Sequence, residues 1–132
     1  MLDTNAISFL LKGHPEVAKR IVAVPVQSLC ISAITHGEIL FGLAKRPGAK
    51  RLHRAVQELL RRVDVLPWTH TTAESYGVVR ADLVRRGKTI APLDLLIAAH
   101  AISIGAVLVT NDKSFGQLKG LEIEDWTVAS AE

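Results

Sequence analysis

The chain has 132 residues, of which 48% are hydrophobic and 22% are charged, and its formal net charge is +3. This length suits one domain with a proper hydrophobic core, so we expect a single domain that spans residues 1–132. No apolar run reaches the roughly 20 residues of a membrane span, and the first residues lack the basic region of a signal peptide, so we expect a cytoplasmic protein without a membrane partner.

The apolar residues of the first half have the spacing of short strands and amphipathic helices. Thr4 or Asn5 can cap the first helix, and Ser32 can cap the third. In that third helix, positions 36, 39, 40 and 43 follow the spacing of a buried face. The elements expected here, in chain order, are a strand at 1–3, helices at 5–11 and 14–23, a strand at 28–31 and a helix at 33–45.

The second half continues the alternation after a break at Pro47 and Gly48. The elements expected here are a basic amphipathic helix at 49–62, a strand at 63–66, helices at 71–86 and 90–105, a strand at 106–110, a helical turn at 113–118 and a strand at 121–124. Because strands alternate with helices throughout, we expect an α/β protein, a three-layer α/β/α sandwich around a mainly parallel sheet.

Four acids interrupt apolar elements that are far apart in the sequence. Asp3, Glu38 and Asp94 are each the only charged residue in an otherwise uncharged stretch (1–11, 21–44 and 89–111), and Asp112 follows the apolar run 106–109. A buried charge costs several kcal/mol unless something pairs with it. Ligands of open parallel sheets gather at the carboxyl ends of the strands, where Asp3, Asp112 and the helix of Glu38 are expected. The four acids therefore predict one shared site.

Carboxylates without a neighbouring His or Cys favour hard cations such as Mg²⁺ or Mn²⁺ over zinc. Metal ions held in this way activate water for attack on a phosphodiester. Thr4, Asn5 and Thr110 adjoin the acids and are candidates to orient a carboxylate or a metal-bound water, although a plain capping role is equally open. The residues indicate metal-dependent hydrolysis of a phosphodiester.

The positive charge is concentrated in one part of the chain. Residues 45–88 hold eleven Lys or Arg but only four acids. Such an imbalance indicates nucleic acid or an acidic protein tail as a partner, although basic helix faces are often merely solvated. Lys45, Arg46, Lys50 and Arg51 lie at the end of the Glu38 helix and the start of the next, and they are candidates to line an RNA path.

Four motifs that carry the acids resemble those of PIN-domain ribonucleases. They are Leu2-Asp3-Thr4-Asn5, Glu38 in a helix after Ser-x-x-Thr, Asp94-Leu-Leu-Ile-Ala-Ala, and Thr110-Asn111-Asp112. Within that superfamily, the chain is most similar to VapC-type toxins of bacterial toxin–antitoxin pairs. The likeness covers nearly the whole length. Two departures are the short stretch of two residues before Asp3 and Ala91 in place of a glycine.

The resemblance implies a compact α/β/α endoribonuclease, usually a homodimer, with Mg²⁺ or Mn²⁺ held by Asp3, Glu38, Asp94 and Asp112. It implies 5′-phosphate and 3′-hydroxyl product ends. It further implies a cognate VapB-type antitoxin, which forms a larger assembly with the toxin and often inserts an Arg or Lys among the acids. Some similar toxins cut initiator tRNA in the anticodon stem-loop, so this RNA is the first expected substrate.

One other class of function stays open at this point, and a further class fits the sequence poorly. In one, the chain is a non-catalytic PIN-like binding module whose acids bind an Arg or Lys of a partner. In the other, a phospho-accepting signalling domain, a pair of adjacent acids would follow the first strand, and Asp3 has no such neighbour. Metal-dependent RNA cleavage by the purified protein would distinguish the nuclease from the binding module.

Overall fold

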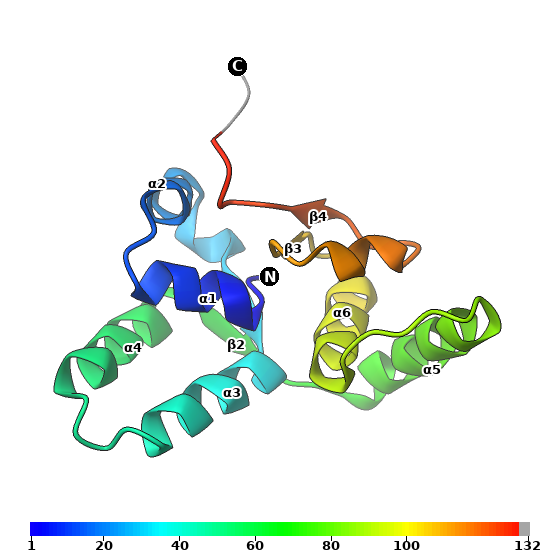
Figure 1. Ribbon diagram of the computed structural model, residues 1–132, viewed down its shortest axis with the longest axis horizontal. Coiled ribbons are helices and arrows are strands. Elements are labelled where there is room, and N and C mark those ends of the chain that lie inside the picture. Colours follow the sequence, from blue (N-terminus) through cyan, green and yellow to red (C-terminus); the bar gives the residue numbers. More distant parts are fainter. Residues whose placement is uncertain (130–132) are drawn as a thin grey trace.

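The computed structural model describes residues 1–129 of the chain. In chain order the elements are α1 (Thr4–Leu11), α2 (Pro15–Ala23), the 3₁₀ turn η1 (Val26–Ser28), β1 (Cys30–Ser32), α3 (Ala33–Ala44), α4 (Lys50–Arg62), β2 (Asp64–Leu66), α5 (His70–Arg85), α6 (Pro92–Ile104), β3 (Leu108–Val109), the 3₁₀ turn η2 (Lys113–Gln117) and β4 (Ile123–Glu124) (Figure 1). Within the described part of the chain, no helix has both the length and the apolar character needed to cross a membrane.

The first three residues connect two pairs of strands. β1 pairs with β2 and β3 pairs with β4, both in parallel. The N–H of Leu2 donates to the carbonyl of Cys30 at 2.9 Å, and the N–H of Asp3 donates to that of Val109 at 3.0 Å. Residues 1–3 are thus the middle strand, with β1 and β2 on one side and β3 and β4 on the other.

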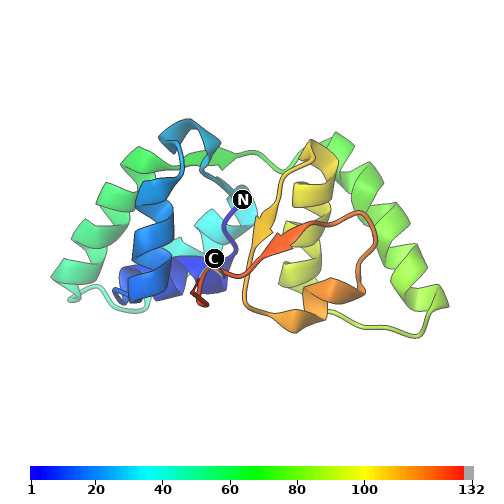
Figure 2. The same ribbon diagram turned by 90° about the horizontal axis from the view of Figure 1, so that it is seen from above.

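Helices cover both faces of these strands. Neighbouring residues on a strand point to opposite faces, and apolar residues on each face pack against a different set of helices. Leu2, Ile31 and Val109 belong to one hydrophobic core, which they share with buried side chains of α1, α2 and α4. Met1 and Leu108 belong to a second core, shared with α5, α6 and η2. Figures 1 and 2 show α1, α2 and α4 on one side of the strands and α5 and α6 on the other. The predicted α/β/α sandwich is confirmed.

The boundaries of α6 follow directly from its sequence. Pro92 occupies the first turn, where its missing N–H has no partner to lose, and Gly105 ends the helix in the left-handed conformation with φ +68°. Half of the side chains between these residues are buried, whereas Leu93 and Ile104 near the two ends are 46% and 45% exposed. The carboxylate of Asp94 lies in the first turn, where the helix dipole favours a negative charge.

Some expectations about helices were wrong. The cap of α1 is neither Thr4 nor Asn5 but Asp3, whose Oδ1 accepts the N–H of Ala6 at 2.7 Å. The hydroxyl of Thr4 is instead used in a contact with Glu38. Leu40, expected to face inward, is 47% exposed because the buried face of α3 is centred on other residues, Thr35 and Ile39.

The strands are shorter than expected or shifted. The strand expected at 28–31 lies at Cys30–Ser32, because η1 occupies the residues before it. The strand expected at 106–110 pairs with β4 only at Leu108–Val109. Thr110 therefore lies just beyond the end of β3.

Candidate active site

The four acids singled out in the sequence all lie at the carboxyl end of the strands. Asp3 directly follows Leu2 in the middle strand, and Asp112 lies three residues beyond β3. Glu38 is carried by α3, which begins immediately after β1, and Asp94 is carried by the first turn of α6. The topology therefore brings four distant segments to one edge of the sheet.

Asp3 is the most deeply buried of the four, with 2% of its surface exposed. Burial raises the pKa of its carboxyl group. Hydrogen bonds from the hydroxyl of Thr110 and the N–H of Ala6 act in the opposite direction, and the charges of Asp94 and Asp112 raise the pKa further. The carboxylate of Asp3 is thus held by the N–H of Ala6 at 2.7 Å, with the hydroxyl of Thr110 and two other acids within electrostatic reach.

Asp94 experiences the same kind of environment. Partial burial raises the pKa of its carboxyl group, and the neighbouring charges of Asp112 and Glu38 raise it further. Because Asp94 is affected by Glu38 and Asp3 is affected by Asp94, these electrostatic effects link all four acids. A cluster of like charges at this edge of the sheet is the result.

Glu38 is held by a residue from another helix. The hydroxyl of Thr4 donates to Oε1 of Glu38 at 2.6 Å. This bond joins α1, which begins beside Asp3, to α3. Thr4 therefore fixes the direction of a site carboxylate, which is the supporting role that the sequence left open beside capping.

Asp112 is fixed within its own loop. Its Oδ1 accepts the N–H of Ser114 at 2.9 Å, and its own N–H donates to the hydroxyl of Thr110 at 3.0 Å. Thr110 therefore contacts both Asp3 and Asp112. Asn5, the third candidate supporting residue, is exposed on the first turn of α1, and the structure gives its side chain no hydrogen bond within residues 1–129.

The four acids suit a hard divalent cation by their chemistry. They offer only carboxylate oxygens, the ligands that Mg²⁺ and Mn²⁺ prefer. A cation would also offset the burial and the repulsion that together raise the pKa of Asp3 and Asp94. As the side chains are placed in residues 1–129, no three acids, His or Cys are close enough to bind one ion together. The cluster is thus electrostatically connected, but it is more open than a formed metal site.

Two buried polar residues beside this cluster were not recognised as partners from the sequence. Oγ of Ser32 accepts the N–H of Ile34 at 3.1 Å and so caps α3, as predicted. The same oxygen lies 2.8 Å from Nδ1 of His100 in α6. Burial lowers the pKa of His100, which favours the neutral ring. The two residues are 68 positions apart, and no local pattern indicates their contact.

A groove between three helices has Glu38 in its lining. It has a volume of about 340 Å³ and lies between α1, α3 and α4. Apolar side chains make up much of its lining, namely Ile7, Leu11, Ile39, Leu43, Leu52 and Val56. Lys12 and Arg46 also line it. The groove combines an apolar surface with one acid, Glu38, and two basic side chains.

The candidate RNA-binding residues Lys45, Arg46, Lys50 and Arg51 lie in the connection between α3 and α4 and at the start of α4, and all four are exposed. The ion pairs of the described chain use other basic residues, Arg20, Arg61 and Arg86. The four candidate residues have no ionic partner in residues 1–129, and one of them, Arg46, lines the groove that also contains Glu38.

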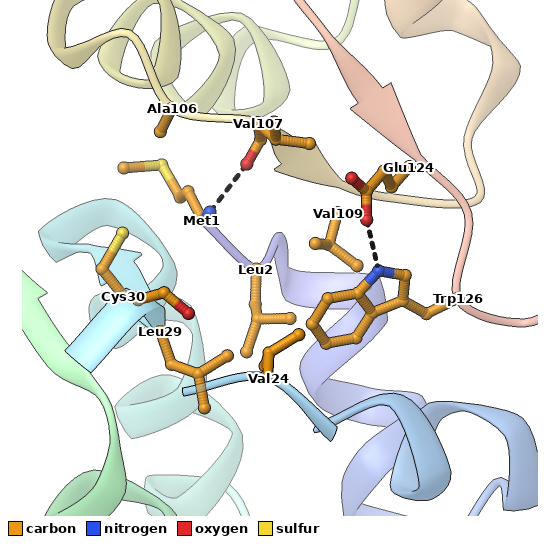
Figure 3. Close-up of a pocket in the computed structure, with 11 residues that line it drawn as sticks. Met1, Leu2, Val24, Leu29, Cys30, Ala106, Val107, Val109, Glu124 and Trp126 are labelled. Carbon is orange, nitrogen blue, oxygen red and sulfur yellow. Dashed lines mark hydrogen bonds between the residues drawn. The ribbon is translucent and has the colours of Figure 1, made fainter. Parts of the chain in front are cut away.

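A second hollow, of about 280 Å³, lies along the strands and reaches from Met1 to Val109 and Trp126 (Figure 3). Its lining includes Met1, Cys30 and Val107, which precede or begin the paired segments. The one acid in its lining, Glu124, already accepts hydrogen bonds from Nε1 of Trp126 and from Arg20. This hollow is mainly apolar and separate from the four acids.

Comparison with known proteins places this geometry in context. The family model of the PIN domain matches residues 1–121. The chain is 37% identical to the tRNA(fMet)-specific endonuclease VapC of Salmonella typhimurium and 34% identical to that of Shigella flexneri. The first alignment covers 96% of both chains, and the second covers 96% of this chain and 97% of the relative.

Solved structures agree with these relatives. The chain superposes on the DNA-bound VapBC structure of Salmonella typhimurium with a TM-score of 0.88 and 37% identity, covering 96% of both chains. It superposes on VapBC-1 of nontypeable Haemophilus influenzae with a TM-score of 0.87 and 35% identity, covering 97% of this chain and 98% of the other.

Proposed function

The chain belongs to the PIN domain family, and on this basis we propose that it is an endoribonuclease toxin of a toxin–antitoxin pair, dependent on Mg²⁺ or Mn²⁺. Relatives that match nearly its whole length are named VapC endonucleases or ribonucleases. The observation that carries the proposal is the convergence of four acids from separate segments at one edge of the sheet, where burial and then the neighbouring charges raise the pKa of Asp3 and Asp94.

The residues of the site have distinct tasks in this proposal. Asp3, Glu38, Asp94 and Asp112 hold the metal, and Thr4 and Thr110 orient the carboxylates that they contact. A divalent ion bound here supplies an activated water and stabilises charge on the phosphodiester. Ionised carboxylates bind a cation, so protonation of Asp3 or Asp94 at low pH would oppose its binding.

The exposed basic residues at the α3–α4 connection bind the RNA backbone in this proposal. Lys45, Arg46, Lys50 and Arg51 are exposed, and Arg46 lines the same groove as Glu38. Phosphate contacts by Lys and Arg supply affinity without reading sequence. Initiator tRNA is the first substrate to test, because two of the relatives are named tRNA(fMet)-specific endonucleases. The expected cleavage site is the anticodon stem-loop.

A VapB-type antitoxin is the proposed protein partner, since similar structures are VapBC complexes. The groove between α1, α3 and α4 offers an apolar surface that leads to Glu38. A partner segment with apolar side chains and one Arg or Lys fits both the groove and the acids. We also propose a homodimer, a higher assembly with the antitoxin, and a cytoplasmic location.

The decisive test is incubation of the antitoxin-free protein with total RNA, with Mg²⁺ or with EDTA, beside Asp94→Asn. Cleavage at discrete positions that requires both the metal and Asp94 supports the proposal, and mapping of the RNA ends identifies the target. A folded, partner-free protein that cuts no RNA with any divalent metal would refute it and favour the binding module.

A further inference from the structure

We infer that His100 is a positioning residue, which acts through Ser32 to set the distance between the helix of Glu38 and the helix of Asp94. This inference rests on the proposed function, because the two acids matter as a pair only if they bind a common ion. It concerns a side chain that lies in the core rather than in the acid cluster itself.

The contact between the two residues is buried and specific. Nδ1 of His100 lies 2.8 Å from Oγ of Ser32, and the two residues are 1% and 0% exposed. Because Oγ of Ser32 already accepts the N–H of Ile34, its own O–H is available to donate to a neutral Nδ1. Water cannot replace a lost partner easily at such a site, so the hydrogen bond restrains the geometry.

The positions of the two residues connect the acid-bearing helices. Ser32 is the last residue of β1 and the cap of α3, which carries Glu38. His100 lies six residues after Asp94 on α6, about 9 Å along the helix axis. The hydrogen bond therefore ties the start of α3 to the interior of α6.

Asp94 depends on such a tie more than the other acids do. Asp3 is held by Thr110 and Ala6, and Glu38 is held by Thr4. The pKa of Asp94 reflects burial and neighbouring charges, without a contribution from a hydrogen bond in residues 1–129. The placement of its carboxylate is thus set by the placement of α6. An ion that joins Asp94 to Glu38 requires α6 and α3 to stay at a suitable separation, so a shift of α6 would weaken binding.

The test compares two polar replacements of similar size. In His100→Asn, the amide lies near the former position of Nδ1 and can still pair with Ser32, whereas in His100→Gln it lies near the former Nε2. Mn²⁺ is titrated into the antitoxin-free variants by calorimetry. We expect His100→Gln to bind Mn²⁺ about tenfold more weakly, as for other residues that support metal ligands, and His100→Asn to stay close to the wild type.

Control variants separate positioning from general loss of stability. Ile97→Val removes a buried methyl group from the same helix, and it should leave Mn²⁺ affinity unchanged. Ser32→Ala removes both the cap of α3 and the partner of His100, whereas His14→Ala removes the cap of α2 and a ring contact with Phe9 without changing α3 or α6. If His100→Gln does not fold, weaker Mn²⁺ binding in Ser32→Ala but not in His14→Ala supports the inference.

Equal Mn²⁺ affinity in His100→Asn, His100→Gln and the wild type would overturn the inference, and so would an equal loss in Ile97→Val. RNA cleavage is measured in parallel on the wild type. A wild type that binds Mn²⁺ but cuts no RNA refutes the proposed nuclease and leaves the affinity comparison to decide the role of His100. A wild type that binds no Mn²⁺ overturns both.

Discussion

Removing the hydroxyl of Thr4 tests directly how the acids are held. Its Oγ1 donates to Oε1 of Glu38 at 2.6 Å in a partly buried position. Thr4→Val preserves the shape of the side chain but removes the donor. A hydrogen bond to a charged group contributes about 1.5–3 kcal/mol, and partial exposure places this one near the lower value. A loss of about 1.4 kcal/mol corresponds to a tenfold change in an equilibrium constant.

We therefore expect Thr4→Val to bind Mn²⁺ about tenfold more weakly, with a similar loss in the rate of RNA cleavage at limiting metal. Calorimetry and initial rates measured over a metal titration provide the two readouts. Thr4→Ser keeps the hydroxyl and should behave as the wild type does. The reasoning is refuted if Thr4→Val retains full metal affinity, or if Thr4→Ser loses as much as Thr4→Val.

Three further predictions concern charge. Asp94→Asn should abolish cleavage yet raise the free energy of unfolding at neutral pH. The pKa of Asp94 is raised in the fold from its ordinary value of 3.8, so the ionised carboxylate destabilises the folded state when the pH is above that value. Thermal melts at pH 7 that show a loss of stability in the variant would contradict this. The folded pKa of His100 is lowered, so the unfolded state binds the proton more readily, and stability contributed by the neutral ring is lost as pH falls below 6.5. In denaturant melts, the free energy of unfolding of the wild type should be lower at about pH 5.5 than at about pH 7.5, and the difference should be smaller in His100→Asn. Equal differences in the two proteins would contradict this role of His100. Finally, Arg46→Ala in the Asp94→Asn background should weaken RNA binding and reduce its salt slope by about 1, whereas Arg61→Ala, which removes a residue already paired with Glu58, should change the slope less.

The helices were predictable because their signals are local. The helix expected at 49–62 lies at Lys50–Arg62, and the one expected at 71–86 lies at His70–Arg85. Both follow from apolar spacing, which depends only on the residues of the helix itself. The strands were less predictable, since a strand ends where its partner ends. β3 pairs over only two residues although the apolar run around it is longer.

The sequence by itself determined the alternation of elements and the four acids, because a lone carboxylate in an apolar element is visible without a fold. That these acids bind a metal stays a prediction. Only the tertiary structure decided which residues hold them: Thr4 contacts Glu38 rather than capping α1, and His100 contacts Ser32 across 68 positions. Local propensities depend on neighbours in the chain, whereas these hydrogen bonds depend on helices that meet only after the sheet has brought them together.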